Sequence, residues 1–130
     1  MRGWQRVVLA LVVVLGLGVV ATASPARAAE YRGCDWHYDT PNGEGTLTFY
    51  KSYNLKVGPL GECDHVALVA KGTTFYVWCE YWNQYDNMWF YGRIAGTQTM
   101  GWAYQDAFGP KIVIGDDNND GVVNIEYCGF

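Results

Sequence analysis

An acidic and amide-rich segment near the C-terminus has the residue types and spacing of a calcium-binding loop. Five of its residues match positions 1, 3, 5, 6 and 9 of that pattern: Asp116, Asn118, Asp120, Gly121 and Asn124. Alternating carboxylate and amide oxygens can converge on one cation, and the glycine permits a sharp turn. The oxygen-bearing side chains of Asp116, Asn118, Asp120 and Asn124 are therefore the candidate metal ligands.

The same segment departs from the calcium pattern at its end. Position 12 is Tyr127 instead of a bidentate acid, and Glu126 falls one place early. No predicted helices flank it, unlike the EF-hand and dockerin-type loops that it resembles. Because Asn, Asp and Gly also dominate plain turns, a solvated hairpin turn is the favoured interpretation. We therefore expect no cofactor, with calcium as the alternative.

The chain offers little for nucleophilic catalysis. Its only imidazole bases are His37 and His65, and a cysteine held in a disulfide is not a nucleophile. The paired carboxylates of a glycosidase need a cleft, and a small barrel offers only a shallow groove. The residues predict a protein that binds and is not an enzyme.

The N-terminal residues have the three parts of a secretory signal peptide. Arg2 and Arg6 give a positive start, residues 7–20 are almost wholly apolar, and Ala26-Arg27-Ala28 matches the small-x-small cleavage pattern. We expect cleavage after Ala28, with cleavage after Ala23 or an uncleaved anchor as alternatives. The protein is then secreted and extracellular.

Cleavage after residue 28 leaves 102 of the 130 residues, enough for one small domain. The signal segment takes three arginines with it, so six basic residues face 13 acidic ones, a formal net charge of −7. Such an acidic chain repels nucleic acid and anionic polymers. We expect no nucleic-acid partner and no membrane association after cleavage.

The exported part contains all four cysteines: Cys34, Cys63, Cys79 and Cys128. An even number in a short exported chain is typical of two disulfides, although spacing alone leaves all three pairings open. No two cysteines lie two to four residues apart, as they would in a typical zinc site.

The elements that must position these residues are strands. Residues 73–82 are dense in β-branched and aromatic side chains, and residues 88–95 and 99–104 continue the pattern after two turns. Strand, loop, strand, tight turn and strand form a β-meander, the expected core sheet of a small barrel. Further strands are predicted at 34–38, 46–57 (with a bend at 51–54), 65–70, 111–114 and 122–127. No segment has an apolar repeat at helical spacing.

The aromatic content exceeds what so small a core can bury: the chain has 6 Trp, 10 Tyr and 5 Phe. In the central strand, alternation places Phe75 and Val77 on one face and Tyr76 and Trp78 on the other, so both faces carry rings. One face lines the core. The favoured interpretation is that the N-terminal arm and the C-terminal tail cover the other, and the alternative is a ligand.

Several short motifs, in this order, resemble the bacterial SH3-like domain, more narrowly its small secreted actinobacterial form. They are Leu55-Lys56-Val57-Gly58-Pro59, Val66 to Val69, Lys71-Gly72-Thr73, Trp89 and Gly101-Trp102. The likeness covers about residues 53–106, and the usual Arg-Ser before the Gly-Pro pair is missing. It implies an SH3-like β-barrel, and it implies that Cys79 pairs with Cys128 and Cys34 with Cys63.

The resemblance implies a non-catalytic binding module for cell-wall or envelope ligands, such as a peptidoglycan peptide or glycan. The expected ligand-binding residues are Tyr53, Trp89, Tyr91, Trp102, Tyr104 and Asp106. The alternative is a secreted protein–protein effector, either an inhibitor or an assembly subunit, that uses the barrel as a scaffold and exposed aromatics at 82–90 as its contact patch. The expected organisation is a signal peptide at 1–28, an arm at 29–45, and a barrel with a C-terminal hairpin at 46–130.

Overall fold

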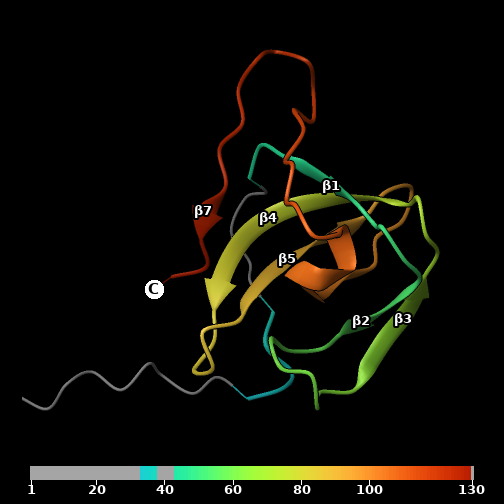
Figure 1. Ribbon diagram of the computed structural model, residues 1–130, viewed down its shortest axis with the longest axis vertical. Helices are drawn as coiled ribbons and strands as arrows, with labels where there is room; N and C mark the ends of the chain where they lie inside the picture. The colour runs from blue at the N-terminus through green and yellow to red at the C-terminus, as the bar shows by residue number, and fades with distance from the viewer. Residues whose placement is uncertain (1–32, 38–42, 130) are drawn as a thin grey trace, which may run out of the picture.

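The protein is all-β in a computed structural model that describes residues 33–37 and 43–129 (Figure 1). The predicted signal peptide and most of the predicted arm lie outside these residues. The elements are β1 (Thr46–Thr48), β2 (Tyr53–Lys56), β3 (His65–Val69), β4 (Thr74–Trp82), β5 (Met88–Ile94), β6 (Met100–Tyr104), the 3-10 helix η1 (Gln105–Phe108) and β7 (Glu126–Tyr127). Within the described residues, no helix has the length and hydropathy of a membrane span.

The strands form one sheet in the order β1-β4-β5-β6-β2-β3, with every neighbouring pair antiparallel. The short β7 adds to β4 in parallel, with Cys79 opposite Glu126. The predicted meander is confirmed as β4, β5 and β6, and Figure 1 shows the two longest of these strands, β4 and β5, side by side across its middle. The order ends at β1 and β3, so strand pairing leaves the sheet open instead of closing it into a barrel.

A β-bulge in β4 lets this strand bury side chains on both faces of the sheet. Between Val77 and Cys79 the register against β5 shifts, so that Val77 lies opposite Gly92 and Cys79 opposite Tyr91. Trp78 is the extra residue in this interval. Because of it, the odd-numbered side chains point to one face of the sheet before the bulge and to the opposite face after it. The predicted faces are therefore correct for Phe75 and Val77, while beyond Trp78 the odd-numbered side chains lie on the opposite face.

The two faces of the sheet bury two separate groups of side chains. The inner cluster holds the aliphatic residues and most of the phenylalanines: Leu47, Phe49, Leu55, Val69, Phe75, Val77, Phe90, Ile94, Ala103, Ala107 and Phe108. The outer cluster holds Cys79, Tyr81, Trp89, Tyr91, Trp102 and Cys128. Each face of the sheet therefore carries a group of buried side chains, and each group must be covered by another part of the chain.

The arm and the tail provide part of those covers, as the favoured interpretation predicted. Ile112, Ile114 and Ile125 of the tail pack against the inner cluster. The Trp36 ring of the arm packs on the outer cluster, with its centroid 5.0 Å from that of Trp102. Both disulfides implied by the resemblance are present, Cys34–Cys63 and Cys79–Cys128.

The C-terminal segment differs from the prediction. Residues 111–114 form no strand, and only Glu126–Tyr127 of the predicted strand at 122–127 is a strand. In the described residues the two halves of the tail do not pair with each other as a hairpin. Gly115 bridges to Thr46 and Asn124 to Glu44, while β7 joins β4, because the bond from Cys128 to Cys79 draws the tail to that edge.

Two smaller predictions were also wrong. The described residues of the strand predicted at 34–38 are not a strand, although Trp36 N donates to Val57 O at 3.1 Å. The helix η1 was missed because a single turn is too short to show helical periodicity. A bend is present near the expected position, but it lies at residues 50 and 51, and Tyr53 and Asn54 already belong to β2.

Candidate functional site

The structure divides the six predicted ligand-binding residues into two sets. Trp89, Tyr91 and Trp102 belong to the buried outer cluster. Tyr53 and Tyr104 are partly buried and Asp106 is exposed, and these three meet where β6 runs into η1. The second set lies beside a groove at η1, whereas Tyr91 of the first set lies at the edge of a separate pocket under the arm.

The buried set has almost no surface to offer a ligand. Trp102 is fully buried, and Trp89 and Tyr91 are 3% and 4% exposed. The arm seals Trp102, because the Trp102 indole donates from Nε1 to the Trp36 carbonyl oxygen at 2.6 Å. The predicted role of these three rings in a groove does not fit their burial, and we assign them to packing.

The exposed set borders a groove of about 250 Å³. It is lined by Tyr104, Gln105, Asp106, Gly109, Pro110 and Ile112. The helix η1 turns the chain directly after β6, and Gly109 ends it with a φ of 100°, a conformation that favours glycine. This sharp turn places the Asp106 carboxylate and the Pro110 ring on the same small depression.

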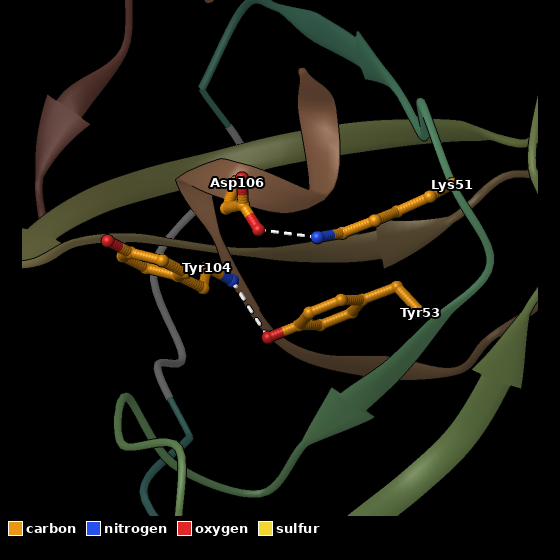
Figure 2. A network of polar contacts seen from close by, with 4 residues as sticks. All are labelled: Lys51, Tyr53, Tyr104 and Asp106. Atoms are coloured by element: carbon orange, nitrogen blue, oxygen red, sulfur yellow. Dashed lines mark hydrogen bonds and ion pairs between the residues drawn. The ribbon is translucent and has the colours of Figure 1, made fainter. Parts of the chain in front are cut away.

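A polar network fixes the mouth of the groove, and Figure 2 shows its four residues. The Tyr104 backbone N–H donates to the Tyr53 hydroxyl at 3.1 Å, while Lys51 and Asp106 form an ion pair. Lys51 and Asp106 come from segments 55 residues apart in the chain. Their side chains are 48% and 64% exposed, so a ligand can reach both charges.

The hydroxyl of Tyr53 stays protonated over an unusually wide pH range. Burial raises the pKa of Tyr53 from 10.0 to about 12; the hydrogen bond from the Tyr104 N–H opposes this shift, and the nearby Asp106 charge adds to it. A neutral phenol therefore faces the ion pair at any physiological pH. It can accept one hydrogen bond and donate another.

A second hydrogen bond holds the other end of Tyr104. Its hydroxyl donates to Asn87 Oδ1 at 3.4 Å, and Asn87 lies in a loop ordered by the buried Asn83. The Asn83 side chain accepts from the backbone N–H groups of Tyr85 and Asn87 and donates to the Pro59 carbonyl. Both the backbone and the hydroxyl of Tyr104 are thereby fixed. Its ring forms a wall of the groove whose orientation is set before any ligand binds.

Sequence reasoning missed several residues of this site. Lys51, Pro110 and Ile112 belong to it, and Tyr50, which is 60% exposed, lies over Gly109. The signal available was their position, because Lys51 lies at the predicted bend and Pro110 directly precedes the strand predicted at 111–114. Their convergence depends on tertiary contacts that periodicity does not report.

The candidate metal loop uses its oxygens internally. Asp116 accepts backbone N–H groups from Asn118, Asn119 and Gly121, and these bonds lower the pKa of the exposed Asp116 carboxyl. Asn118 and Asp120 each accept one further backbone N–H. The geometry is that of a self-capped turn, and within the described residues no three acidic, His or Cys side chains are grouped to hold a metal. Calcium binding by Asp116, Asn118, Asp120 and Asn124 stays an untested alternative.

The patch expected at 82–90 is only partly exposed. Trp82 and Tyr85 are 44% and 65% exposed, whereas Trp89 and Phe90 are buried. Two rings at the β4–β5 turn therefore remain as a surface for a protein partner.

Comparison of the chain with family models, curated proteins and solved structures found no match. The function is therefore argued from the geometry.

Proposed function

We propose that this protein is an exported, SH3-like, non-catalytic binding module whose ligand is a peptide of the cell wall or envelope. The observation that carries the proposal is the exposed Lys51–Asp106 pair beside a groove walled by Tyr104, Pro110 and Ile112. The two disulfides support export, because such bonds persist in oxidising compartments.

The chemistry of the groove favours a short peptide that carries both an amine and a carboxylate. Asp106 can accept from an ammonium group while Lys51 donates to a carboxylate, so both partners of the ion pair are satisfied after it opens. Tyr104, Pro110 and Ile112 form the apolar walls of the groove. The conformations of these side chains are already restricted, which limits the entropy that the protein loses on binding. Peptidoglycan stem peptides have this combination of charges. A phosphate polymer would be repelled by the net acidic chain.

Co-sedimentation with purified cell-wall sacculi tests the proposal. We expect the wild-type protein to pellet with sacculi and the Asp106→Asn and Lys51→Gln variants to lose binding about three- to tenfold, the range expected for exposed charged hydrogen bonds. Glu62→Gln is the matched control, because this exposed carboxylate lies outside the groove. A wild-type protein that stays in the supernatant contradicts the proposal, as does equal binding by all four proteins.

The alternative function is a protein–protein effector, favoured by the exposed Trp82 and Tyr85 rings. Size-exclusion chromatography of native culture medium separates the two functions. A stable larger complex that Tyr85→Ser disrupts would favour the effector, and a monomer retained on sacculi would favour the wall-binding module.

A further inference from the structure

A second pocket lies between the arm and the outer face of the sheet, away from the groove at η1. Its volume is about 230 Å³. The lining comes from the arm, from the β2–β3 region and from β5 and β6: Asp35, Trp36, His37, Val57, Val66, Tyr91, Met100 and Gly101. It shares no lining residue with the groove.

The arm wall of this pocket is held in place by three contacts. Trp36 donates its backbone N–H to Val57, its carbonyl accepts from Trp102, and its ring lies edge-on to Tyr81 with centroids 4.9 Å apart. One residue before Asp35, the Cys34–Cys63 disulfide anchors the chain. The pocket is therefore a fixed feature of the oxidised protein.

Gly58 allows this close approach of the arm. A Cβ at that position would meet Cys34 Cα at 2.8 Å and Cys63 Sγ at 3.0 Å. A side chain there would clash with the backbone of the arm, so glycine permits the observed position of the arm.

The chemistry of the lining suits a positive charge on an apolar body. Trp36 contributes ring surface, Met100 a polarisable thioether, Asp35 a carboxylate and His37 an imidazole, while the buried Tyr91 closes the inner end. No lysine or arginine lines the pocket, and no ion pair involves Asp35 among the described residues. Aromatic faces and a carboxylate together attract an organic ammonium ion more strongly than either does alone.

We propose that this pocket is a binding site for an organic ammonium group, held against the Trp36 ring with its charge facing Asp35. A volume of about 230 Å³ accommodates a head group the size of choline or the end of an amine-bearing side chain. The site does not depend on the proposed wall-binding function, because the groove at η1 uses different residues.

Titration of the oxidised protein with choline chloride, followed by NMR of the Met100 methyl and the Trp36 indole, tests this site. The probe is compared with 3,3-dimethylbutanol, which has the same shape and no charge. We expect choline to shift both signals and to bind about tenfold more tightly than the neutral analogue, the size of a cation–π contact. Asp35→Asn should weaken choline binding several-fold and leave binding of the neutral analogue unchanged.

The variants are chosen to preserve the fold. Asp35 has a φ of 64°, a conformation that asparagine tolerates, so the Asn variant keeps the arm geometry. Glu62→Gln removes the same charge outside this pocket and should bind choline like the wild type. Equal affinity for choline and the neutral analogue would overturn the proposal. So would an Asp35→Asn variant with wild-type affinity, or the absence of shifts at Met100 and Trp36.

Discussion

Gly92 lies in the middle of β5, where the absence of a side chain lets β4 and β5 pack closely. A Cβ at this position would lie 2.2 Å from the Tyr76 carbonyl oxygen and 3.0 Å from the Phe75 ring. Val77, its partner across the strands, lies at the start of the bulge that separates the inner from the outer cluster. The identity of one residue therefore supports the two-core arrangement.

The substitution Gly92→Ala should destabilise the protein by about 1–3 kcal/mol, because an overpacked core must shift its backbone. Gly61→Ala is the matched control, since a Cβ at this exposed position would meet nothing within 4 Å. Urea unfolding followed by circular dichroism measures both. Equal stability of the two variants would contradict the close packing at Gly92.

Tyr53 connects the candidate groove to stability at high pH. Its folded-state pKa of about 12 lies above the ordinary value of 10.0, so the folded protein holds the phenolic proton more tightly than the unfolded chain. That contribution to stability is complete below pH 10 and is lost as the pH rises from there through about 12.

The Tyr53→Phe variant should therefore lose less stability than the wild type between about pH 10 and about pH 12. At neutral pH it should be less stable by about 1–3 kcal/mol, because the Tyr104 N–H loses its acceptor. Tyr85→Phe is the control, since this ring is 65% exposed. Urea unfolding at each pH gives the comparison, and identical pH profiles for the two variants would contradict the assignment.

At the scale of elements, the two disulfides hold two different covers and differ in exposure. Cys79 and Cys128 are fully buried, and their bond fixes the tail beside β4. Cys34 is exposed while its partner Cys63 is buried, and their bond fixes the arm over Trp102. Thiol–disulfide exchange needs access of a thiolate to a sulfur, so the two bonds should react at different rates.

Under native conditions, dithiothreitol should reduce Cys34–Cys63 on the order of tenfold faster than Cys79–Cys128. One thiolate of the reagent attacks Cys34 and displaces the Cys63 thiolate, and its second thiol then closes a cyclic disulfide and frees Cys34. Alkylation with mass spectrometry identifies the reduced pair. A red shift of tryptophan fluorescence should accompany this first step, as the arm leaves Trp102. Simultaneous reduction of both bonds would contradict this order.

At the scale of the whole molecule, an open sheet is stabilised by burying both of its faces. A sheet of short strands with one covered face would expose the rings of Trp89, Tyr91 and Trp102 to water. Covering them needs the arm, and covering the inner cluster needs the tail isoleucines. The aromatic residues that exceed the capacity of one core thus belong mostly to a second core. Among the described residues, exposed rings lie beside the groove (Tyr50), near the β4–β5 turn (Trp82 and Tyr85) and on β7 (Tyr127).

Local features of the chain were enough to predict the strand class, the meander at 74–104 and the bend before Tyr53. Patterns of neighbouring residues determine these features, and alternation over a few positions reports them directly. The number of disulfides followed from the even cysteine count, and their pairing, implied only by resemblance, is confirmed. The signal peptide, which lies outside the described residues, stays a prediction.

Tertiary structure alone decided which rings are buried and which line a groove. Trp36 covers Trp102 from 66 residues away, and Lys51 meets Asp106 across 55. The bulge at Trp78 inverts the faces of β4, and the tail pairs with β4 and with residues 44–46 instead of with itself. Alternation assigns a side chain to a face but carries no information about which distant segment covers that face, because that depends on the energy of packing the whole chain.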